Sequence, residues 1–129
     1  MERKVYPPGA GDVTLELGDE KLVLRATLNA GLTISRTAGG IRGAIDKVMQ
    51  MDFDTIASVI RAGVGQKEAK KHDIEQLLWD NGLMDSQGQV LAKVVEFLTN
   101  LARGGRPAEE EDSEKKEDTE GREPLSPPR

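Results

Sequence analysis

The chain has 129 residues, 36% of them hydrophobic and 32% charged, and its formal net charge is −5. This length is typical of one domain, and a chain without cysteine can form neither a disulfide framework nor a thiolate zinc site. Its apolar runs fall far short of the roughly 20 residues of a membrane-spanning helix, so the sequence predicts a soluble cytoplasmic protein.

Acidic charge is concentrated at the C-terminal end. Residues 104–129 contain nine acidic and five basic residues, four prolines and one large apolar side chain, Leu125. Such a segment cannot bury enough surface to offset about 1–2 kcal/mol per residue of lost backbone entropy, so we predict a disordered acidic tail. Residues 1–10 are expected to be a flexible lead-in, and residues 11–103 to form the packed domain. That domain is nearly neutral, which argues against binding to nucleic acid.

Alternating apolar and polar residues predict two β-strands between residues 12 and 27. The segment Gly18-Asp19-Glu20 tolerates a tight reversal, so the strands should form an antiparallel hairpin with one apolar face. Because an isolated hairpin is only marginally stable, that face must pack on other elements. The apolar positions are Val13, Leu15, Leu17, Leu22, Leu24 and Ala26.

After Thr27 the apolar spacing changes to three and four residues, which is typical of helices. A short first helix should carry Leu28, Leu32, Ile34 and Ser35 and end at Gly39-Gly40. A second helix is predicted by one apolar stripe of five residues: Ile41, Ala44, Ile45, Val48 and Met49.

The third helix should begin after an N-cap at Asp52 and end at Gly63 and Gly65, followed by a polar connector over residues 67–72 that can be partly helical. Its stripe comprises Phe53, Ile56, Ala57, Ile60 and Val64. A fourth helix should follow the N-cap Asp73, carry Trp79 and end at Asn81-Gly82. We expect Trp79 in the core rather than as an interface anchor, although tryptophan is also enriched at interface hot spots.

The last predicted helix, capped by Ser86, is apolar around more than half of its circumference. Such a helix is either enclosed at the centre of the domain or in contact with a partner. Its apolar residues are Val90, Leu91, Val94, Val95, Phe97, Leu98 and Leu101. Together these elements predict an α+β fold in which an N-terminal β-hairpin packs on a bundle of four to five helices.

No group of residues in the sequence matches a catalytic or metal-binding pattern. His72 is the single histidine and is expected to be solvated beside Lys71 and Asp73. The glycines of residues 38–44 lack the spacing of a phosphate-binding loop, and residues 80–88 lack the oxygen ligands of a calcium loop. The sequence therefore predicts no enzyme, no catalytic residue, no cofactor and no metal.

The order of these segments resembles a known family. Residues 11–31, GDVTLELGDEKLVLRATLNAG, are similar to the start of the tail assembly chaperones of gene transfer agents and siphophage-like prophages. The resemblance continues through VIRAGVG at residues 59–65, IEQLLWDNGL at 74–83 and VVEFLTNLARGG at 94–105. One departure is Arg36, in a region where relatives commonly carry acidic residues.

The resemblance implies a non-enzymatic binding protein. Such proteins hold the long, mostly helical tape-measure protein soluble in the bacterial host cytoplasm until tail-tube subunits polymerise around it. Self-association is also expected, but binding to membranes or nucleic acid is not. Because they combine large apolar area with helices that have apolar surface to spare, the candidate partner contacts are Trp79, Phe97, Leu98 and Leu101.

Two alternatives remain open from the sequence. The protein could be a structural, tail-tube-associated component of the particle, in which an edge of the 13–27 hairpin adds to a neighbour's sheet. It could also be a host adaptor module unrelated to phage.

Overall fold

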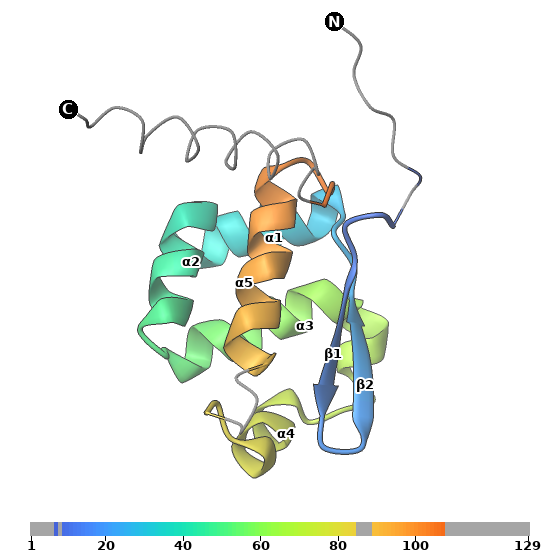
Figure 1. Ribbon diagram of the computed structural model, residues 1–129, viewed down its shortest axis with the longest axis vertical. Helices are drawn as coiled ribbons and strands as arrows, with labels where there is room; N and C mark the ends of the chain where they lie inside the picture. The colour runs from blue at the N-terminus through green and yellow to red at the C-terminus, as the bar shows by residue number, and fades with distance from the viewer. Residues whose placement is uncertain (1–6, 8, 85–88, 108–129) are drawn as a thin grey trace, which may run out of the picture.

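The computed structural model describes residues 7, 9–84 and 89–107. Within them a two-stranded hairpin precedes five helices, so the predicted α+β class is confirmed (Figure 1). The elements are β1 (Val13–Leu17), β2 (Glu20–Leu24), α1 (Leu28–Ala38), α2 (Gly40–Met49), α3 (Phe53–Ala69), α4 (Ile74–Asn81) and α5 (Gln89–Ala102). The predicted disorder of the acidic tail and the predicted cap at Ser86 concern residues that lie largely outside this description.

The hairpin has the register that its alternation predicts. Strands β1 and β2 pair antiparallel, with Val13 opposite Leu24 and Leu17 opposite Glu20. The inward-facing side chains, Val13, Leu15, Leu17, Leu22 and Leu24, are at most 3% exposed. Helix α5 packs along β1 and α3 along β2, so the helices cover the apolar face of the hairpin.

Helix ends follow local capping chemistry. The Thr27 hydroxyl accepts a hydrogen bond from the Ala30 amide at 3.1 Å, and the Asp73 carboxylate accepts one from the Gln76 amide at 3.1 Å. These bonds satisfy backbone donors that have no partner inside a helix. Helix α1 ends at Gly39, whose φ of 75° lies in the left-handed region that glycine adopts without strain.

The predicted end of the third helix is wrong at Gly63 and only partly right at Gly65. Helix α3 continues to Ala69 with a kink at Gly65, where φ is 88° and ψ is 159°. Gly63 lies inside the helix and does not end it. Its missing side chain allows Leu24 and Phe97 to pack closely against α3. Residues 67–69, the start of the connector predicted over residues 67–72, belong to the last turn of α3, so that connector is partly helical.

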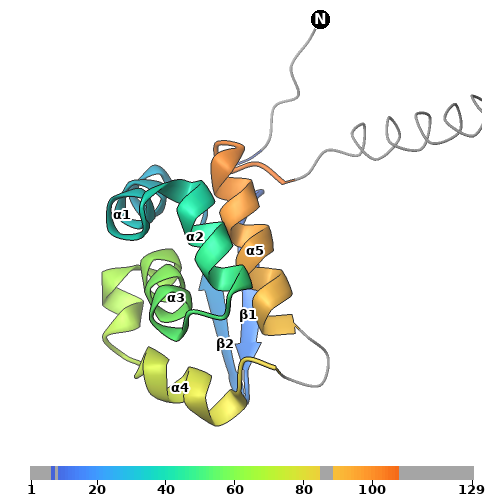
Figure 2. The same cartoon turned by 90° about the vertical axis from the view of Figure 1, so that its left-hand side faces the viewer.

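Helix α5 packs on α2 and on strand β1 and lies at one side of the molecule in the view of Figure 2. Val90, Val94, Phe97 and Leu98 have no exposed surface, so the excess of apolar residues on this helix is largely enclosed. At its C-terminal end the Asn100 side-chain amide donates to the Gly11 carbonyl at 3.0 Å, and the Gly105 amide donates to the Asn100 carbonyl at 2.8 Å. The packed part of the chain therefore extends to Gly105.

In the part of the chain that is described, no helix combines the length and apolarity required to cross a bilayer.

Candidate partner-binding surfaces

Two of the four predicted partner contacts belong to the core. Phe97 and Leu98 are completely buried, so the expectation that they contact a partner is wrong for this structure. The reason is that α5 is covered by the hairpin on one side and by α2 on the other. Their size and apolarity, which suggested an interface, instead fill the centre of the domain.

Trp79 and Leu101 are accessible but lie on separate surfaces. Trp79 is 74% exposed, so the expectation of a core tryptophan is wrong, whereas Leu101 is half-buried. Helix α4, which carries Trp79, lies at the opposite end of the molecule from the C-terminal end of α5 (Figure 1). Met84, just beyond α4, is also exposed. The four predicted residues therefore do not form one site.

Leu101 belongs to an apolar groove between α1, the start of α2 and the end of α5, here called the α1–α5 groove. The cavity has a volume of about 380 Å³. Within it Leu28 is 79% exposed and Leu32 is 40% exposed. The lining residues are Ala26, Thr27, Leu28, Gly31, Leu32, Ser35, Ile41, Leu101, Gly104 and Gly105.

The orientation of α1 explains why leucines line this groove. Ala30, Ile34 and Ala38, spaced four residues apart, form the buried face of α1 and leave Leu28 and Leu32 outward. Gly31 also lines the groove, and a Cβ atom built there would lie 4.0 Å from the Leu101 Cδ2 atom, at an ordinary van der Waals distance. The sequence signal for this orientation was the four-residue spacing of Ala30, Ile34 and Ala38. The larger side chains of Leu28 and Leu32 instead favour burial of the neighbouring face.

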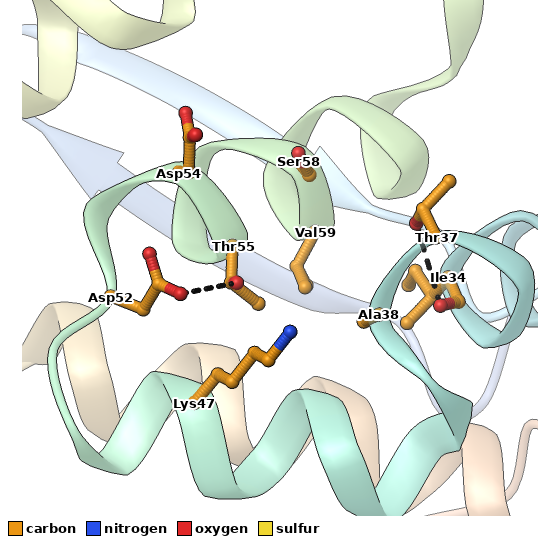
Figure 3. Close-up of a pocket in the computed structure, with 9 residues that line it drawn as sticks. All are labelled: Ile34, Thr37, Ala38, Lys47, Asp52, Asp54, Thr55, Ser58 and Val59. Atoms are coloured by element: carbon orange, nitrogen blue, oxygen red, sulfur yellow. Dashed lines mark hydrogen bonds between the residues drawn. The ribbon is translucent and has the colours of Figure 1, made fainter.

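A second concave region, the α1–α3 cleft, has a mainly polar lining in its smaller part and a mixed polar and apolar lining in its larger part. One part has a volume of about 340 Å³ and the other about 610 Å³, and both parts include Thr37 and Ser58. Figure 3 shows Lys47 reaching from α2 into the first part, beside the pair in which the Thr55 hydroxyl donates to the Asp52 carboxylate at 3.1 Å. Neither histidine nor cysteine lines this cleft.

Asp52 is the N-cap residue of α3, as predicted, but it does not cap the helix through its side chain. It precedes α3, but its side chain makes no capping hydrogen bond to the backbone and instead accepts from the Thr55 hydroxyl. Asp52 and Asp54 lie at the start of α3, where negative charge interacts favourably with the helix dipole.

An ion pair between α3 and α4 lowers the pKa of one carboxyl group of the described residues, that of Glu75. The Arg61 guanidinium donates to the Glu75 carboxylate, and this hydrogen bond is the main reason that the pKa of Glu75 lies below its ordinary value of 4.5. Nearby, the His72 Nδ1 atom lies 3.9 Å from the Glu20 carboxylate, and the His72 side chain is only 21% exposed. The expectation of a fully solvated His72 is therefore wrong.

The described residues contain no cluster of three or more histidine or carboxylate side chains that could hold a metal ion.

Comparison with known proteins adds no further constraint. No family model, curated protein or solved structure matches the chain. The resemblance to tail assembly chaperones therefore stays a prediction that experiments on the protein must test.

Proposed function

We propose that this protein is a tail assembly chaperone that binds the tape-measure protein of a phage-like tail and keeps it soluble in the bacterial host cytoplasm. The observation that carries the proposal is the α1–α5 groove, where Leu28, Leu32 and Leu101 present apolar surface in a concave site. The proposed activity is binding alone, without a catalytic step or cofactor, and the tail-tube subunits take over the tape-measure protein at assembly.

The groove suits an apolar helical segment for a physical reason. Removing one leucine-sized side chain fully from water is worth about 1.5–3 kcal/mol, and on one face of α1 Leu28 is largely exposed while Leu32 is partly exposed. An amphipathic helix can place its apolar stripe into such a groove while its polar face stays hydrated. Covering the same stripe on a long helical tape-measure protein would prevent those segments from associating with each other.

Co-expression with a tape-measure protein encoded nearby in the same genome tests the proposal. We expect the two proteins to co-purify, and the variant Leu28→Ser/Leu32→Ser to lose most of the captured tape-measure protein while remaining folded by circular dichroism. The matched control is Val23→Ser, which removes an exposed apolar side chain from the outer face of the hairpin. Clean separation of the wild-type proteins at mild salt would contradict the proposal.

The fate of the protein after assembly separates a chaperone from a structural component. Mass spectrometry of purified particles should find little or none of this chain relative to tail-tube protein. A stoichiometric amount in finished tails would favour the structural alternative instead.

Trp79 provides a test of whether a second surface takes part. Because it lies at the other end of the molecule from the α1–α5 groove, Trp79→Ser should leave tape-measure binding unchanged if the groove is the main contact. The same substitution should scarcely change the free energy of unfolding, because the indole ring is largely solvated.

A further inference from the structure

The residues next in sequence to the lining of the α1–α5 groove are rich in arginine, and one carboxylate, that of Asp12, accepts a hydrogen bond from the amide of the groove-lining Ala26 at 2.9 Å. Every charged residue next in sequence to a groove-lining residue is an arginine, and none is an aspartate or a glutamate. These arginines come from the end of β2, from α1 and α2, and from both sides of the Gly104-Gly105 pair. They are Arg25, Arg36, Arg42, Arg103 and Arg106.

Four of these arginines have no carboxylate within ion-pair distance among the described residues. Only Arg42 has such a neighbour, Asp46, at 3.8 Å, and that pair is exposed. Elsewhere in the described structure some cations are paired, namely Arg61 with Glu75, Lys71 with Glu68 and Lys93 with Glu96, whereas Lys47, Lys67 and Lys70 have no carboxylate within ion-pair distance among the described residues. The groove is therefore an apolar hollow next to five arginines, four of which have no ion pair in the described part of the chain.

We infer that the α1–α5 groove selects an amphipathic helix whose apolar stripe is flanked by aspartate or glutamate. This inference rests on the proposed function and specifies the chemistry of the segments that are bound. The leucines would receive the stripe, and the arginines would meet the flanking carboxylates, to which guanidinium groups can donate two parallel hydrogen bonds. Rim charges of this kind mainly determine which partner binds and how fast, while the apolar centre supplies most of the affinity.

The acidic segment of this chain is a poorer occupant than an external helix. Residues 108–129 contain nine acidic residues but only one large apolar side chain, Leu125. Such a segment matches the arginines in charge but cannot fill a groove lined by Leu28, Leu32, Ile41 and Leu101. An external helix that combines leucines with carboxylates matches both features.

Two synthetic helical peptides with the same leucine stripe, one flanked by glutamate and the other by lysine, test the inference on the full chain. Fluorescence anisotropy of labelled peptides should give an affinity about tenfold higher for the glutamate peptide at low salt, since each exposed pair contributes modestly. The preference should vanish near 1 M salt, where the Debye length is about 3 Å. The net charge of the whole chain, −5, predicts the opposite preference, so a preference for glutamate must arise from the local arginines.

Charge reversal locates the effect. Arg36→Glu/Arg106→Glu, both at exposed positions on the border of the groove, should invert the peptide preference. The matched control Lys21→Glu/Lys67→Glu makes the same change in net charge at exposed positions away from the groove and should keep the glutamate preference. Circular dichroism melts check that both variants fold.

The outcomes separate the inference from the proposed function. Equal binding of the two peptides, or equal effects of the two double variants, would overturn the charge selection while leaving apolar binding intact. Binding of neither peptide would contradict the groove as the binding surface, and with it the proposed function. The charge-reversal variant could also dissociate a complex of two copies of this chain while binding both peptides as the wild type does. That result would overturn the inference as well.

Discussion

Gly63 shows how one missing methyl group sets the position of a helix. A Cβ atom there would lie 3.0 Å from the Cβ atom of Leu24 and 3.1 Å from Cζ of Phe97. Alanine should gain about 1 kcal/mol of helix propensity but lose more, about 1–3 kcal/mol, to overpacking against side chains that cannot rotate away. We therefore expect Gly63→Ala to lower the free energy of unfolding by about 1 kcal/mol, measured by urea denaturation.

Gly31→Ala is the matched control for this prediction. It makes the same change inside α1, but the nearest atom to its Cβ is 4.0 Å away, so only the propensity gain of up to about 1 kcal/mol should remain. A Gly63→Ala protein as stable as wild type would show that α3 can move away from β2 at little cost.

Asn100 is the polar residue on which the closure of the domain depends. Its side chain is 3% exposed and donates to the Gly11 carbonyl, which joins the end of α5 to the residues before β1. Asn100→Ala leaves that carbonyl without its donor and should cost about 1–3 kcal/mol of unfolding free energy in chemical denaturation. Thr99→Ala, which removes a hydroxyl bonded only to the preceding turn of α5, should change stability by less than about 0.5 kcal/mol. Equal effects of the two substitutions would contradict the role of Asn100.

At the scale of elements, the Arg61–Glu75 pair joins α3 to α4 and makes their contact sensitive to pH. The pKa of Glu75 in the folded protein lies below 4.5, so its stabilising effect is complete above pH 4.5 and is lost as the pH falls through the lowered pKa. Because both side chains are partly exposed, the pair should contribute only about 0.2–1 kcal/mol at pH 7. A double-mutant cycle with Arg61→Gln and Glu75→Gln should give this coupling at pH 7 and none at strongly acidic pH. A coupling that is unchanged at acidic pH would contradict the assignment.

The ends of the helices can be predicted from the sequence where the interactions that determine them are local. Thr27, Asp73 and Gly82 lie at helix ends because their capping partners are within a few residues, so sequence alone locates α1 and α4. Gly63 is different, since the same residue type ends some helices and permits close packing in others. Its role depends on Leu24, which is distant in sequence and adjacent in space.

The same distinction explains the outcome for the candidate contacts. Apolar periodicity identifies α5 as a helix but does not show whether its wide apolar surface faces a partner or the domain itself. Burial of Phe97 and Leu98 results from the packing of α2 and β1 on either side, and the exposure of Trp79 results from Ile74 and Leu78 forming the buried face of the short helix α4. The α1–α5 groove forms only where three elements meet. Of its lining residues, Leu101 alone was among the candidate partner contacts predicted from the sequence.

At the scale of the whole molecule, charge and packing are divided between different parts of the chain. Residues 1–107 contain fourteen acidic and fourteen basic residues, so the net charge of −5 is carried entirely by residues 108–129. Fold stability, by contrast, comes from the enclosed side chains around α5. A neutral body that exposes an apolar groove is prone to self-association unless like-charge repulsion between molecules opposes it.

Removing residues 108–129 should therefore leave the melting temperature unchanged while promoting association at low ionic strength and pH 7, measured by dynamic light scattering. The control keeps the full length but neutralises the chain with Glu109→Gln, Glu110→Gln, Glu111→Gln, Asp112→Asn and Glu114→Gln. If charge is the cause, this variant should associate as the truncated chain does, and added salt should bring the wild-type protein closer to both. If the neutralised chain instead stays monodisperse while the truncated chain associates, steric shielding by the segment, and not its charge, keeps the groove-bearing body soluble.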